Sequence, residues 1–212
     1  SKALLLTLCA VLLVAASVLG TMAYLTSTDT VTNTFTVGSV AIKLDEAKAN
    51  PDGTLVEGAD RVKANEYKLL PGHTYNKDPM VTVLNGSEAS YIKMTVTFSK
   101  ASALDAIFAP TGADLTSIFN GYDSTHWIYT DNTKDATADT RTYEFWYKEA
   151  VGAPTADVAL DALFDSIKVP ERVTGEQLAR LNGFKISVVA EAIQADGTGT
   201  ADEAWAKFEA QG

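Results

Sequence analysis

The sequence predicts a mainly β fold, an antiparallel jelly-roll-like β-sandwich with short helical insertions, preceded by an N-terminal hydrophobic helix. The first observation behind this prediction is a series of about eight or nine segments in which apolar and polar residues alternate, as in half-buried strands. The second is that these segments do not alternate regularly with helical patterns, which disfavours parallel β-α-β units. The third is that 212 residues with 46% hydrophobic content suffice for one such core, and no long Pro-rich or Ser-rich linker divides residues 24–212.

The N-terminal residues 1–23 are expected to form a signal peptide that is removed on export. The basic Lys2 precedes an almost wholly apolar run at 3–20, and Thr21-Met22-Ala23 places small residues at the positions that a signal peptidase requires. Cleavage is therefore predicted between Ala23 and Tyr24. The alternative is a retained single-span anchor, because the run approaches the roughly 20 residues that cross a bilayer.

The first strand of the mature chain is predicted at 31–37, where apolar residues alternate with threonines. Further strands are predicted at 40–44, 67–70, 80–84, 91–98, 127–129, 141–147, 166–169 and 184–195. Asn85-Gly86-Ser87 predicts a hairpin between the strands 80–84 and 91–98. A second hairpin is expected to join 127–129 to 141–147 through a polar loop at 130–140.

Short helices are predicted where apolar residues recur at helical spacing, at 101–108, 114–119, 159–164, 174–181 and 201–211. A capping-box pattern from Thr174 to Gln177 begins the fourth of these, and Asn182-Gly183 ends it. The long strand 184–195 has apolar residues on both faces, which predicts cover on both sides. Its Glu191 and Gln194 form either a buried polar pair or a solvent-facing one, and the pattern leaves both open.

Composition excludes several functions and offers little chemistry for an enzyme. A net charge of −10 and a pI near 4.6 disfavour nucleic-acid binding, and the one cysteine, Cys9, lies in the apolar run. His73 and His126 are the only histidines; they lack metal-ligand spacing and are expected to be turn residues. We therefore predict no catalytic residue, no cofactor and no metal ligand. The acidic segment 131–139 is interpreted as a solvated hairpin tip, with calcium binding as the alternative.

Several short segments carry a resemblance to a known family. The junction 19–29 reads Leu-Gly-Thr-Met-Ala-Tyr-Leu-Thr-Ser-Thr-Asp, and residues 33–38 follow it with Asn-Thr-Phe-Thr-Val-Gly. Similar elements recur at 71–72, 77–83, 91–94, 190–196 and 203–205. Together these residues resemble the SipW-dependent exported proteins of Firmicutes, which include TasA-type biofilm matrix fibre proteins and camelysin.

The resemblance implies a jelly-roll-like sandwich, processing by a signal peptidase of the SipW type, and a place in the extracellular matrix or on the surface of a Gram-positive bacterium. Members similar to TasA polymerise by donor-strand exchange, in which the N-terminal segment of one subunit completes the sheet of the next. The corresponding donor here is 24–37, with the side chains of Tyr24, Val31, Asn33, Phe35 and Val37. Self-association into a homopolymer is therefore expected, with membrane contact only through an uncleaved signal. Pairing of this segment within its own subunit is equally open.

Two alternatives follow from the same observations. Camelysin-like members are described as metallo-endopeptidases, although this chain departs from any zinc-protease pattern. A monomeric surface adhesin that uses the polar loops 45–63 and 130–140 is the other alternative, because exposed loops on a rigid sandwich often bind ligands.

Overall fold

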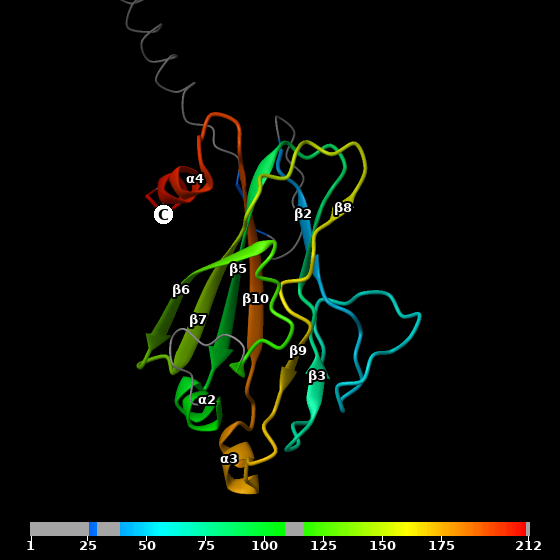
Figure 1. Cartoon of the computed structure of the whole chain (residues 1–212), viewed down its shortest axis with the longest axis vertical. Coiled ribbons are helices and arrows are strands. Elements are labelled where there is room, and N and C mark those ends of the chain that lie inside the picture. Colours follow the sequence, from blue (N-terminus) through cyan, green and yellow to red (C-terminus); the bar gives the residue numbers. More distant parts are fainter. Residues whose placement is uncertain (1–25, 29–38, 109–116, 211–212) are drawn as a thin grey trace, which may run out of the picture.

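The computed structural model describes residues 26–28, 39–108 and 117–210 (Figure 1). The predicted signal peptide and its cleavage site at Ala23 and Tyr24 lie outside the described residues. The same holds for the other four predicted donor residues, Val31, Asn33, Phe35 and Val37, and for the first part of the predicted helix 114–119. Within the described part of the chain, no helix is long and apolar enough to cross a membrane.

The described chain is mainly β, with antiparallel sheets and a few short helices. A five-stranded sheet has the order β1-β10-β5-β7-β6, a second sheet has the order β2-β4-β8, and β3 pairs with β9. The strands are β1 (Thr26–Thr28), β2 (Ile42–Asp45), β3 (Thr74–Asn76), β4 (Met80–Val83), β5 (Ser90–Ser99), β6 (Trp127–Asp135), β7 (Thr140–Tyr147), β8 (Val158–Ala159), β9 (Ser166–Lys168) and β10 (Ile186–Gln194).

The core lies between the five-stranded sheet and the two smaller sheets. Alternate residues of β5 are fully buried on one face of the large sheet: Ile92, Met94, Val96 and Phe98. They belong to one hydrophobic cluster with Val81 and Val83 of β4, Tyr75 of β3 and Ile167 of β9. The smaller sheets therefore cover this face of the large sheet, and alternation along the strands supplies the residues that do so.

Aromatic rings fill the centre of that core. Phe119 is 1% exposed, and its ring centroid lies 4.7–5.7 Å from those of Phe98, Tyr143, Phe145 and Phe164. Two of these contacts are edge-to-face, with interplanar angles of 83°. Such pairs favour one arrangement of the rings because the electropositive edge of one meets the electronegative face of the other.

The opposite face of the large sheet is partly covered by the C-terminal helix α4 (Ala201–Glu209). A second hydrophobic cluster forms there, in which Ile193 of β10 packs with Ala204 and Trp205. The long strand β10 thus has cover on both faces, as its apolar residues predict. In Figure 1, α4 lies at one end of the sheet, whereas α2 (Ala101–Phe108) and α3 (Gly175–Arg180) lie at the other.

Two helix predictions are confirmed in detail. Helix α2 has the predicted bounds and buries Leu104, Ile107 and Phe108. Helix α3 begins at the predicted capping box, in which the Thr174 side chain accepts a hydrogen bond from the Gln177 amide and the Gln177 side chain accepts one from the Thr174 amide. These bonds satisfy two amide groups that a helix start leaves unpaired.

The predicted hairpin between 80–84 and 91–98 is wrong. Strands β4 and β5 follow one another in the chain, but β4 pairs with β2 and β8, whereas β5 pairs with β10 and β7. The turn at Gly86 instead carries the chain from one sheet to the other, and the Gly86 amide donates to the Pro154 carbonyl. The second hairpin, β6–β7, is confirmed, but its strands run to Asp135 and Thr140, so the connecting loop is shorter than predicted.

Two further predictions differ from the structure, and a third, the loop 45–63, has anchored ends that the sequence did not indicate. Residues 159–164 begin with the end of β8 and are not helical; the amides of Leu160 and Leu163 donate to the carbonyls of Val81 and Pro79 beside β4. Residues 67–70 form no strand, and β3 follows them instead. The loop 45–63 is anchored at both ends, because buried Asp45 accepts hydrogen bonds from Arg61 and the amides of residues 46 and 62 donate to each other's carbonyls.

Candidate assembly edge and histidine cluster

The outer edge of β10 is the first candidate site. On its inner side, all nine residues of β10 pair with β5 from Ile186↔Phe98 to Gln194↔Ser90. On its outer side, β1 pairs only with Glu191, Ala192 and Ile193. Among the described residues, no strand pairs with the outer side of 186–190. These five residues are Ile, Ser, Val, Val and Ala, so four of them are apolar and none is charged.

The opposite edge of the same sheet, at β6, has features that hinder the addition of another strand. Strand β6 carries Asp131, Lys134 and Asp135, all exposed, and its register shifts between Tyr129 and Asp131. Charged side chains and bulges are the usual means by which proteins block edge-to-edge pairing. In the part of the chain that the structure describes, the sheet therefore has one protected edge, at β6, and one edge, at β10, where no strand pairs with the outer side of 186–190.

The pairing of β1 with β10 is the described part of the predicted donor segment 24–37. Thr26, Ser27 and Thr28 pair antiparallel with Ile193, Ala192 and Glu191 of the same chain. This is the intramolecular alternative for three of the fourteen residues, and the remaining ones lie outside the described residues. The pairing shows that β10 accepts an extended segment at this edge.

Glu191 connects this edge to the C-terminal helix. Its backbone pairs with Thr28, while its carboxylate lies 3.1 Å from the Lys93 ammonium on β5. The Lys93 side chain is 6% exposed, and its ammonium lies 4.8 Å from the centroid of the Trp205 ring on α4. Neither option for Glu191 in the sequence is observed as stated, because its carboxylate pairs with buried Lys93 rather than with Gln194 and its side chain is 20% exposed.

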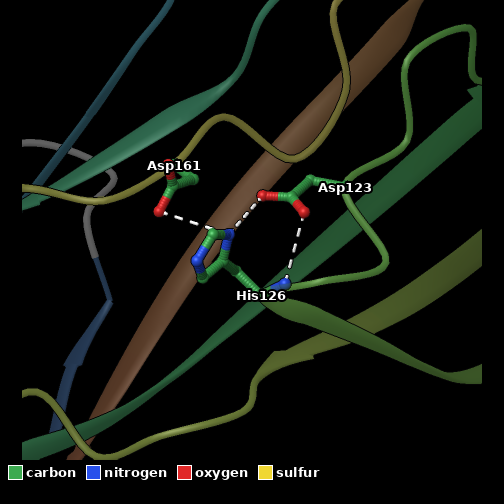
Figure 2. Close-up of side chains that lie close together, drawn as sticks. All are labelled: Asp123, His126 and Asp161. Carbon is green, nitrogen blue, oxygen red and sulfur yellow. Dashed lines mark hydrogen bonds and ion pairs between the residues drawn. The ribbon is translucent and has the colours of Figure 1, made fainter.

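The second candidate site is a cluster of Asp123, His126 and Asp161 (Figure 2). The His126 Nδ1 lies 2.6 Å from Asp123 Oδ2 and 3.4 Å from Asp161 Oδ2. Figure 2 shows this ring nitrogen directed between the two carboxylates. The side chains are 23–54% exposed, so the cluster lies at the surface.

Buried Trp127 positions both acidic residues. Its backbone amide donates to the Asp123 carbonyl at 3.0 Å, and its indole Nε1 donates to the Asp161 carbonyl at 3.0 Å. The Asp123 amide in turn donates to the Leu163 carbonyl, which ties the turn before β6 to the segment after β8. Because Trp127 is 1% exposed, the backbones that carry the two carboxylates are held by the core.

The local hydrogen bonds orient the ring and shift its titration. Asp123 Oδ1 accepts from the Thr125 and His126 amides, which leaves Oδ2 to face the imidazole. The hydrogen bond with Asp123 raises the pKa of His126, against the smaller opposing effect of burial. Burial alone would raise the pKa of Asp123, but hydrogen bonds from His126 and Thr125 outweigh it and lower that pKa.

Tyr147 completes the surroundings of the cluster. Its ring stacks on His126 with centroids 6.1 Å apart and an interplanar angle of 11°, and its hydroxyl donates to Asp161 Oδ2 at 3.3 Å. A nearby cation is Lys148, whose ammonium is bonded to the Ser124 carbonyl at 2.8 Å. The described surroundings thus place two carboxylates and an imidazole nitrogen within 4.8 Å of one another.

The other residues considered from the sequence lie elsewhere. His73 is exposed in the turn before β3, and its ring lies 6.3 Å from that of Tyr75. In the acidic segment 131–139, Asp135 accepts hydrogen bonds from the amides of residues 137 and 138, and Asp139 accepts from the Ser102 amide and hydroxyl at the start of α2. These two carboxylates therefore stabilise the hairpin turn and a helix start.

Sequence reasoning placed His126 in a turn but missed the cluster around it. The spacing of Asp123 and His126 was visible, whereas Asp161 reaches them only through the path of the chain after β8. Comparisons of the chain with protein-family models, with curated proteins and with solved structures found no match. The resemblance to SipW-dependent exported proteins therefore remains a prediction that depends on the short segments that carry it.

Proposed function

We propose that this chain is an exported structural protein of a Gram-positive cell surface or biofilm matrix, which assembles into fibres by donor-strand exchange at the outer edge of β10. The observation that carries the proposal is the contrast between the two sheet edges. Among the described residues, the β10 edge is uncharged and mostly apolar at 186–190 and is paired only at Glu191, Ala192 and Ile193, whereas the β6 edge is charged and bulged. An extended segment at such an open edge gains main-chain hydrogen bonds, and its alternate side chains add specificity.

The finer description of the fold belongs to the same proposal. A jelly-roll-like sandwich is supported by the way in which consecutive strands change sheets, as β4 and β5 do, and by one core shared among the three sheets. Export with cleavage between Ala23 and Tyr24 is supported by the N-terminal sequence alone. We propose a non-enzymatic role, in which the strand edge rather than a catalytic group is the active part of the molecule.

The test separates the donor from the acceptor edge. A chain that begins at Ser39 would be mixed with a fluorescent peptide of residues 24–37, and binding followed by anisotropy beside a scrambled peptide. Electron microscopy would compare fibre formation by the chain that begins at Tyr24 and by the same chain with residues 24–37 deleted. We expect saturable peptide binding and fibres only when the segment is present. Monomers under every assembly condition, together with no difference between the two peptides, would refute the proposal.

A pair of variants makes the test specific to the edge. Val189 lies half-buried on the outer face of β10, and Thr95 is its antiparallel partner on the same face of the interior strand β5. Val189→Lys adds a charge to the edge strand, which should weaken peptide binding at least about tenfold. Thr95→Lys adds the same charge one strand further in, where no strand can be added, and should have little effect on binding.

A further inference from the structure

We propose that Asp123, His126 and Asp161 form a binding site for one divalent transition-metal ion of the Zn²⁺ class, which cross-links the turn before β6 to the segment after β8. The cluster combines an imidazole nitrogen with two carboxylates from separate segments of the chain. Imidazole with carboxylate oxygens suits zinc and its neighbours, whereas calcium and magnesium prefer oxygen ligands alone.

The distances fit such an ion with a small adjustment. Zinc binds nitrogen and carboxylate oxygen at about 2.0–2.2 Å, so ligands 3.4 Å apart subtend an angle of about 110°, close to tetrahedral. The His126 Nδ1 and Asp161 Oδ2 have this separation. The Asp123 oxygen, 2.6 Å from Nδ1, must move away by roughly 0.8 Å, because an ion takes the place of the shared proton. Solvent can supply the fourth ligand, since the cluster is at the surface.

The charges and the supporting contacts favour a cation here. Two carboxylates beside a neutral imidazole give a site charge that matches a divalent ion, and the whole chain carries −10. The carbonyls that fix Asp123 and Asp161 are bonded to buried Trp127, while Asp161 is oriented by Tyr147. Hydrogen bonds to ligands from outside the coordination shell are the usual support of a metal site. Lys148 opposes binding weakly, because its ammonium is held at the Ser124 carbonyl.

Titration calorimetry with Zn²⁺ on tag-free mature protein at neutral pH tests the site, with Co²⁺ absorption as a second measurement. We expect one ion per chain and an intense Co²⁺ d–d band typical of four-coordinate geometry. His126→Ala should lower the affinity at least tenfold, and Asp161→Asn should also lower it. His73→Ala removes the other histidine, at the exposed turn before β3, and should leave the affinity unchanged.

Three results would overturn the proposal: no saturable binding, binding with the same affinity in His126→Ala, or an equal loss in His73→Ala. Circular dichroism checks that each variant is folded, and Asp161→Asn keeps the size of the side chain should His126→Ala misfold. The site lies beside β6, at the sheet edge opposite β10. Its failure would therefore leave the strand-exchange proposal standing, and the reverse also holds.

Discussion

Among the described residues, the buried ion pair between Lys77 and Glu46 should be highly sensitive to the loss of one partner. Their charged atoms lie 2.5 Å apart, and the side chains are 9% and 5% exposed. Glu46 also accepts a hydrogen bond from the Asn65 side chain at 2.9 Å, so the pair holds both ends of the loop that follows β2. Removal of one partner leaves the other charge buried without compensation.

We expect Lys77→Met to lower the free energy of unfolding by about 3–5 kcal/mol, because the buried Glu46 carboxylate loses its charged partner and, among the described residues, keeps the side-chain amide of Asn65 as its hydrogen-bond donor. The double variant Lys77→Met/Glu46→Leu removes both charges and should recover most of that loss, since apolar replacement of a whole buried pair is often neutral or stabilising. The coupling energy between the two positions is therefore expected to be about 3 kcal/mol or more.

Urea unfolding followed by tryptophan fluorescence gives all four corners of this double-mutant cycle. The surface pair Lys134–Asp105 is a matched control, with a distance of 2.6 Å but side-chain exposures of 35% and 27%. Lys134→Met should cost only about 0.2–1 kcal/mol. Two results would contradict the reasoning. One is a loss in the free energy of unfolding below about 1 kcal/mol for Lys77→Met, and the other is a loss in the double variant equal to the sum of the losses in the two single variants.

Three other outcomes can be measured on the same purified protein. Gly53→Ala should lower the free energy of unfolding by about 1–3 kcal/mol, because φ of Gly53 is +92° and the new Cβ would lie 2.5 Å from the Thr74 carbonyl oxygen. Gly58→Ala is the control, because φ of Gly58 is +69° but the space around it is open; urea unfolding should show a smaller loss for this variant. Trp205→Ala should detach α4 from the sheet and lower the free energy of unfolding by about 3–5 kcal/mol. Amide hydrogen exchange should become faster in 201–209 before it does elsewhere. Unchanged protection of these amides would contradict the prediction. Burial raises the pKa of Glu144, so its ionisation opposes folding. The advantage of Glu144→Gln over the native chain in the free energy of unfolding should be absent near pH 3, where Glu144 is neutral in both the folded and the unfolded state, and should grow as pH rises toward 7. An advantage that shrinks over this range would refute the reasoning.

The sequence predicted the class of the fold because strand periodicity and helix caps are local signals. Helix α3 has its start encoded in four adjacent residues, and the alternation in β5 and β10 follows from which faces are buried. The segment 159–164 shows the limit of such signals. Its Leu160, Leu163 and Phe164 recur at helical spacing, yet they point into the core from an irregular segment whose amides bond to the backbone beside β4.

The failed hairpin has a similar cause. Asn85-Gly86 supplies a good turn, and Gly86 does adopt φ +78°, but a turn sequence does not specify which sheet the next strand joins. That choice depends on packing in the core, where Val81 and Val83 of one sheet belong to the same hydrophobic cluster as Ile92 and Met94 of the other. The Asp123–His126–Asp161 cluster was missed for the same reason, because Asp161 lies far from the other two residues in the sequence and is brought beside them by tertiary contacts such as the bond from the Trp127 indole to its carbonyl.

The position of Glu191 has a mechanical consequence. Its backbone holds Thr28 of the N-terminal strand, and its carboxylate holds Lys93 beneath the C-terminal helix. By the described contacts, a force applied between β1 and α4 therefore passes through β10 near Glu191, at the C-terminal end of that strand. The aromatic core around Phe119 lies off that line of force, so a pull on the two ends should load the β1 hydrogen bonds and the α4 contacts while the body of the domain stays intact.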